Sequence, residues 1–223
     1  MANFDLNSDT IRDLNQRLHQ TPAISVTVTH PGGRHNVACG VDDEFDVLID
    51  GHVGYYCAGM NKVASITVNG NAGPGVAENM MSGTVRIKGN ASQYAGASGH
   101  GGTLVIEGDA SARCGISMKG VDIVVAGNVG HMSAFMAQKG RLVICGDAGD
   151  FLGDSIYEAQ IFVLGSVGEL GADCIEKEMT SKHKWALQEL LDATGIEAKA
   201  GDFRRYGSAR KLYSFNIDHA DDY

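Results

Sequence analysis

Three pairs of carboxylates in this 223-residue chain have a spacing that could support glycoside hydrolysis. The pairs are Asp109 with Asp147, Asp150 with Glu169, and Asp154 with Asp173. If 19-residue segments stack as neighbouring strands, the first pair would lie ~10 Å apart and the other two ~5 Å apart. The longer distance is near the range of inverting glycosidases, and the shorter one suits a retaining enzyme. Spacing alone therefore allows acid/base chemistry at all three pairs.

A repeated turn explains the first pair more simply. Asn71, Asn90 and Asn128 occupy the same position in the 19-residue pattern as Asp109 and Asp147, and both residue types suit turns. The other two pairs lie in the last repeats, where solvated charges are expected. We therefore predict no catalytic residues in this chain, and we keep a self-sufficient carbohydrate-active protein as the alternative.

The cysteines and histidines do not form a metal-binding pattern. The five cysteines contain no Cys-x-x-Cys pair, and the eight histidines occupy unrelated positions in the repeat. Cys57 and Cys114 share a position but lie three repeats apart, ~14 Å by the strand spacing, which is too far to share one metal ion. We predict reduced thiols and no metal site. The glycine-rich segment 70–75 also lacks the Gly-Lys-Ser/Thr ending of a phosphate-binding loop.

A strict 19-residue repeat must position all of these side chains. It is marked by seven glycines in register: Gly51, Gly70, Gly89, Gly108, Gly127, Gly146 and Gly165. The four residues before these glycines read VLID, ITVN, VRIK, LVIE, IVVA, LVIC and IFVL, with aliphatic residues first and third. This alternation predicts one strand per repeat with one face buried.

The rest of each repeat is also constrained. A second glycine follows three residues after the first in five repeats, as Gly54, Gly73, Gly130, Gly149 and Gly168, whereas Ser92 and Ser111 replace it in two. Seven residues after the first glycine, every repeat has alanine or glycine, which predicts a crowded position. One strand per 19 residues favours an all-β, parallel β-helix of about seven coils, because each coil buries its aliphatic face only by stacking. Leucine-rich, calcium-binding nonapeptide and hexapeptide repeats do not match.

The segments outside the repeat predict caps at both ends. Residues 8–19 have helical spacing with Ser8 or Asp9 as the N-cap, and a second helix begins at Thr180 or Ser181 and ends near Gly195. The predicted organisation is an N-terminal capping-helix region (1–23), a β-helix (24–179), a C-terminal capping helix (180–195) and a tail (196–223).

The tail has the composition of an interface, with aromatic and basic residues close together. The residues expected to contact a partner are Phe203, Arg204, Arg205, Tyr206, Arg210, Lys211, Tyr213 and Phe215. Deletion of residues 203–223 would then abolish assembly and leave the solenoid folded. The alternative is that the tail wraps around its own solenoid.

The composition narrows the function classes. Apolar residues make up 43% and charged residues 20% of the chain, which excludes intrinsic disorder. The formal charge of −9 argues against non-specific binding to nucleic acid or to an anionic membrane. No apolar run approaches a membrane span, and residues 1–4 lack the features of a signal peptide. A cytoplasmic location is therefore expected.

The repeat resembles one family. The motif Gly-x-x-Gly-x-x-x-Gly/Ala, seen at Gly51, Gly54 and Ala58 and again in the repeats that begin at Gly127 and Gly146, is similar to the GXGXG β-helix at the C-terminal end of the glutamate synthase large subunit. A formylmethanofuran dehydrogenase subunit shares this β-helix. The resemblance covers residues 47–178 and implies a right-handed parallel β-helix.

The short ends and the tail resemble the stand-alone β-helix subunits of N-methylglutamate synthase (methylamine-glutamate N-methyltransferase). This resemblance implies a hetero-oligomer with a class II amidotransferase-like subunit and an FMN-binding synthase-like subunit. FMN and any iron–sulfur cluster would belong to the synthase-like partner, with no cofactor bound by this chain. The complex would make N-methyl-L-glutamate and ammonia from methylamine and L-glutamate. Other glutamate-synthase-type or formylmethanofuran dehydrogenase complexes are the alternatives.

Overall fold

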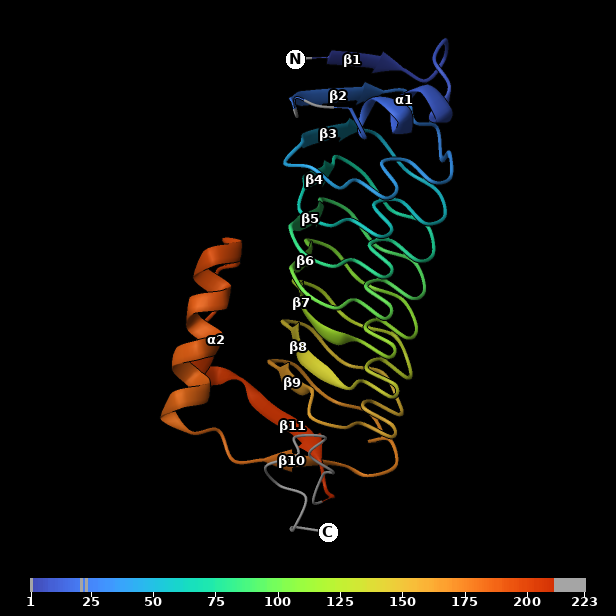
Figure 1. The fold of residues 1–223 in the computed structure, drawn as a ribbon. Helices are drawn as coiled ribbons and strands as arrows, with labels where there is room; N and C mark the ends of the chain where they lie inside the picture. The colour runs from blue at the N-terminus through green and yellow to red at the C-terminus, as the bar shows by residue number, and fades with distance from the viewer. Residues whose placement is uncertain (1, 21, 23, 211–223) are drawn as a thin grey trace, which may run out of the picture.

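Stacked strands form one continuous sheet. The computed structural model describes residues 2–20, 22 and 24–210, and its sheet has 11 strands in the order β1-β2-β3-β4-β5-β6-β7-β8-β9-β11-β10. The solenoid strands are β3 (Asp46–Asp50), β4 (Ser65–Val68), β5 (Thr84–Ile87), β6 (Thr103–Ile106), β7 (Lys119–Val125), β8 (Lys139–Ile144) and β9 (Gln160–Val163). All their pairings are parallel. The predicted parallel β-helix is confirmed (Figure 1).

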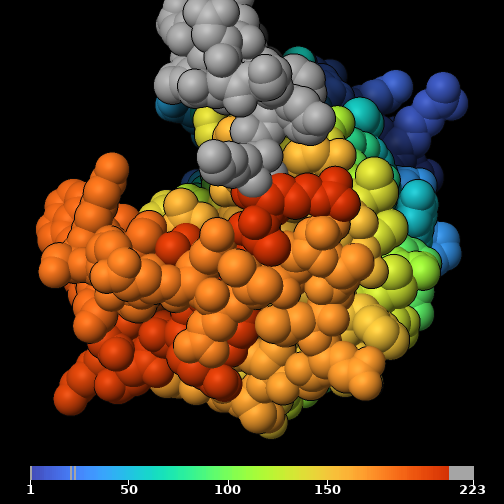
Figure 2. Space-filling view, turned by 90° about the horizontal axis from the view of Figure 1, so that it is seen from below, coloured from blue at the N-terminus to red at the C-terminus, as the bar shows by residue number. Residues whose placement is uncertain are grey.

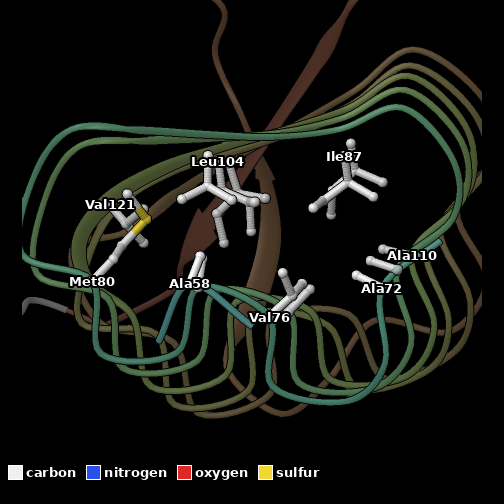
Figure 3. Close-up of a cluster of buried hydrophobic side chains, with 14 of the residues drawn as sticks. Ala58, Ala72, Val76, Met80, Ile87, Leu104, Ala110 and Val121 are labelled. Atoms are coloured by element: carbon white, nitrogen blue, oxygen red, sulfur yellow. The ribbon is translucent and has the colours of Figure 1, made fainter. Parts of the chain in front are cut away.

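The register of the sheet follows the 19-residue repeat. Ile66 pairs with Val85, Val85 with Leu104 and Leu104 with Ile123, so that equivalent aliphatic residues stack in one row. Their side chains are fully buried. Figure 3 shows Leu104 and Ile87 pointing from the sheet toward Ala58 and Val76 on the opposite wall. The core is therefore the interior of the coils.

The N-terminal end differs from the predicted cap. Strands β1 (Ala2–Asp5) and β2 (Ser25–Thr29) extend the sheet in parallel, so β1 and not a helix is the last strand at this end. Helix α1 (Ile11–Arg17) lies within this first coil, with Leu14 buried. Its N-cap is Thr10 rather than Ser8 or Asp9, because the Thr10 hydroxyl accepts a hydrogen bond from the Asp13 amide at 3.1 Å.

The wall opposite the sheet has an unusual backbone. We define the left-handed wall as residues 56–60, 75–79, 94–98, 113–117, 132–136 and 151–155. The first, third and fifth residue of each segment have positive φ. The third is always alanine or glycine, and it lies against the core. A larger side chain there would combine an unfavourable backbone with crowding, which explains the invariant small residue.

Helix α2 (Ser181–Thr194) forms where it was predicted, with Thr180 as the N-cap and Gly195 as a left-handed C-cap. It stands beside the sheet and does not cover the end of the solenoid (Figure 1). Leu187 and Leu191 belong to the same buried cluster as Val143 and Phe162, on the outer side of β8 and β9.

Two arginines of the sheet also bind this helix. Arg86 donates to the Thr194 carbonyl at 2.6 Å, and Arg141 donates to the Ala186 carbonyl at 3.0 Å. Arg86 thereby places its charge at the helix C-terminus, where the helix dipole favours a cation. The expected capping helix is thus a lateral helix.

The C-terminal end is closed by two strands instead. After the short helix η1 (Ala200–Asp202), β11 (Arg204–Ser208) inserts antiparallel between β9 and β10 (Cys174–Lys177). The segments that follow β9 cover this end when it is viewed along the solenoid (Figure 2). The part of the tail up to Arg210 therefore completes its own fold, as in the alternative stated above.

Candidate functional site

A polar ladder runs along the edge of the solenoid, at the residue after each repeat glycine. Each ladder side chain accepts a hydrogen bond from the backbone amide of the next ladder residue, 19 positions later. The bonds run from Asn71 to His52 (2.9 Å), Asn90 to Asn71 (2.9 Å), Asp109 to Asn90 (2.8 Å), Asn128 to Asp109 (2.7 Å), Asp147 to Asn128 (2.7 Å) and Ser166 to Asp147 (2.7 Å). Asp109 and Asp147 are thus structural acceptors.

The ladder also works against acid catalysis by this pair. The backbone hydrogen bond from Ser166 holds the pKa of Asp147 below its usual 3.8, whereas a general acid needs a raised pKa. The other two carboxylate pairs are engaged as well. Asp150 accepts from the Glu169 amide at 3.0 Å, Asp154 accepts from the Ser155 hydroxyl at 2.8 Å, and Asp173 forms an ion pair with Arg210. This geometry disfavours the carbohydrate-active alternative.

The ladder makes a testable distinction between two substitutions of Asp109. Asp109→Asn should leave the free energy of unfolding nearly unchanged, because asparagine serves in three other coils. Asp109→Ala should lower it by about 1 kcal/mol, the typical value of one hydrogen bond. Urea unfolding of both variants measures the difference. Equal losses in both would contradict the ladder's role.

The same ladder predicts a pH dependence. Because the pKa of Asp147 is lower in the folded protein, its stabilisation is present above the unfolded value of 3.8 and is lost as the pH falls through the folded value. Asp147→Asn should remove this part of the acid sensitivity.

The repeat glycines leave no room for a side chain. A Cβ on Gly127 would overlap the Asp109 carboxylate of the preceding coil, and one on Gly130 would lie 2.6 Å from the Ala112 nitrogen. The other repeat glycines named above are crowded in the same way, by the ladder side chain or the backbone of the preceding coil; only at Gly51 is Pro31 the neighbour. Their role is close approach of stacked backbones.

The thiols have the character of core residues. Burial raises the pKa of Cys57 and Cys114 to about 12, and that of Cys145 and Cys174 to about 11. Among the described residues, no three His, Cys, Asp or Glu side chains are placed to hold a metal ion.

One open hollow lies at the ends of β2 and β3. It has a volume of about 780 Å³ and is lined in part by His30, Asp50 and His52. His30 lies 2.9 Å from Asp5, and His52 accepts the first ladder bond. Both imidazoles therefore have structural contacts.

The structure corrects the expected interface role of two tail residues. Phe203 lies in the buried cluster under α2, and Tyr206 belongs to the solenoid core. Neither side chain is available to a partner while β11 is in place.

The tail arginines also have contacts within the chain. Arg204 donates to the Gly165 carbonyl at 2.7 Å, Arg205 donates to the Glu178 carbonyl at 2.9 Å, and Arg210 pairs with Asp173. Lys211, Tyr213 and Phe215 lie outside the described residues, and their expected role stays a prediction.

Exposed apolar side chains gather instead on and beside the left-handed wall. Two groups are found there, one toward each end of the solenoid. The N-terminal group contains Tyr55, Met60 and Met81, and the C-terminal group contains Met136, Phe151, Tyr157 and Leu170. Such patches commonly mark protein–protein contacts. The sequence-based search missed them because it tested the repeat for chemistry and not for exposed apolar residues.

Comparison with known proteins identifies a full-length relative. Over 228 residues, and over 100% of both chains, the protein is 58% identical to Protein GlxC of Rhizobium meliloti (strain 1021). No family model matches the chain. No solved structure matches it either. In the part that the structure describes, no helix has the length and apolar character needed to cross a membrane.

Proposed function

Since the chain belongs to the same protein family as Protein GlxC, we propose that it is a non-catalytic scaffold subunit of a glutamate-synthase-like enzyme. One observation carries this proposal. The in-phase carboxylates are engaged in the fold, whereas large apolar side chains lie exposed on the outer wall. A surface of this kind suits the binding of other chains better than chemistry on a small substrate.

The finer proposal is N-methylglutamate synthase, which rests on the resemblance of the repeat and the tail. In this enzyme the solenoid joins the amidotransferase-like subunit to the FMN-binding synthase-like subunit. The flavin chemistry and the choice of methylamine belong to those partners, and this chain sets their relative positions. A cytoplasmic location accompanies this proposal.

Purification of the native protein from its own host tests the proposal. We expect amidotransferase-like and synthase-like chains to co-purify with it, and the sample to show flavin absorption. The purified complex should then convert methylamine and L-glutamate to N-methyl-L-glutamate, detected by mass spectrometry, with ammonia as the comparison amine. Partners that carry tungsten or molybdenum would favour the formylmethanofuran dehydrogenase alternative. A colourless, solitary chain would contradict the proposal.

A further inference from the structure

The repeat itself shows which exposed side chains the fold does not need. The first position of each wall segment is glycine in one coil (Gly75), and the fifth is serine in three coils (Ser98, Ser117 and Ser155). The coil therefore accepts small or polar residues at both positions.

Two C-terminal coils carry large apolar residues at these positions. Phe151 stands at the first position with φ 60° and is 46% exposed, and Met136 stands at the fifth with φ 52° and is 43% exposed. A left-handed backbone costs a residue with a side chain about 1 to 2 kcal/mol. An exposed phenylalanine there does not recover this cost by burial within the chain. Strain without a folding benefit is a pointer to function.

These side chains lie close together. We define the C-terminal apolar patch as Met132, Met136, Phe151, Tyr157 and Leu170. Backbone hydrogen bonds join its coils: Met132 donates to Asp150, Met136 to Asp154, and Phe151 to Glu169. Since adjacent coils are separated by about 4.8 Å, the patch is a continuous apolar strip across three coils.

Carboxylates dominate the rim of this patch. Asp150, Asp154, Glu158 and Glu169 lie beside its residues in the same two coils, and none is buried. Two cations, Arg113 and Lys139, lie in the preceding coils. Two copies of the chain that met on a twofold axis would bring like charges together, which is unfavourable. A partner with basic side chains around an apolar centre would complement this charge.

We infer that the C-terminal apolar patch is the docking surface for a different subunit, one that presents an apolar face rimmed by lysine and arginine. This inference rests on the proposed function, which supplies the partner. It assigns the contact to the wall opposite the sheet, on the coils that end with β9, instead of to the buried residues of β11.

The repeat provides a matched test. The chain is co-expressed with the amidotransferase-like and synthase-like subunits of its host, and its affinity for them is measured with purified proteins. Phe151→Gly and Met136→Ser each introduce a residue that another coil already carries at that position. We expect binding to weaken about tenfold or more for Phe151→Gly, and to weaken for Met136→Ser. Melting temperatures should stay near the wild-type value.

Met60→Ser is the control, because Met60 occupies the same position as Met136, has φ 57° and is 46% exposed, but lies outside the patch. Its binding should be unchanged. In a charge-reversed double variant, Glu158→Lys with Glu169→Lys, association should slow and lose part of its salt dependence.

The outcomes separate this inference from the proposed function. If the wild-type complex forms and Phe151→Gly and Met136→Ser bind with full affinity, the patch is not the docking surface, although the proposed function stands. If Met60→Ser alone weakens binding, the contact lies at the N-terminal coils and the inference is overturned. A wild-type homodimer that Phe151→Gly dissociates would assign the patch to a second copy. A wild-type chain that binds neither subunit would overturn both.

Discussion

Gly153→Leu is expected to lower the free energy of unfolding by about 4 kcal/mol, the sum of two penalties. The first is backbone strain, because Gly153 has φ 67°. The second is crowding, because a Cβ at this position would lie 2.7 Å from the Cys174 sulfur and 3.0 Å from Ile161 Cδ1. The leucine would have to displace core side chains on two elements, and urea unfolding measures the loss.

Two control substitutions isolate these penalties. Gly201→Leu introduces the same side chain where no atom lies within 4 Å of the new Cβ and where φ is not positive. Lys88→Leu changes a half-exposed residue whose ion pair with Glu107 (2.8 Å) lies at the surface, where such pairs contribute at most about 1 kcal/mol. Both should be close to neutral. A loss at Gly153 no larger than at these two positions would contradict the stacked-coil packing.

The solenoid could be predicted because its long-range order is written in short segments. Every strand pairs with the segment 19 residues away, so Ile66, Val85 and Leu104 stack without any further information about topology. The ladder was predictable for the same reason, since Asn90 and Asp109 must meet once the coils stack. Only the residue types needed interpretation, and their repetition in register supplied it.

The left-handed wall could be predicted only in part. The invariant alanine or glycine at its third position signals crowding, but tyrosine, methionine and phenylalanine at its first position disfavour positive φ on local grounds. The stacking of coils overrides that local preference. The backbone amides of the wall donate to the neighbouring coils in both directions, as Met132 does to Asp150 and Ala134 does to Cys114.

The position of α2 was missed although the strands carry a signal for it. In the first three quartets, the residue between the inward aliphatics is Leu48, Thr67 or Arg86. In the last four it is always apolar: Val105, Val124, Val143 and Phe162. A strand that is apolar on both faces needs a cover on both faces, and this change indicates where the helix packs. Strand β1 had no such signal, because four residues outside the repeat show no period.

Phe203→Ala tests the corrected role of the tail and should lower the free energy of unfolding by about 3 to 4 kcal/mol. Phe203 is only 3% exposed and shares its cluster with Phe162 and Leu190, so its removal leaves a cavity beneath α2. Trp185→Ala is the matched control, because this aromatic side chain on α2 is 65% exposed, and its loss should cost little stability.

The same geometry changes how the tail must be truncated. Deletion of residues 203–223 removes β11, which pairs with β9 on one side and β10 on the other. The solenoid would lose the strand that closes its C-terminal end, so failure to assemble would report misfolding as well as any lost contact. Deletion of residues 211–223 keeps β11 and tests Lys211, Tyr213 and Phe215 alone. If Phe203→Ala unfolded at wild-type urea concentrations but failed to assemble, the residue would contact a partner after all, and the buried cluster under α2 would not describe the free protein.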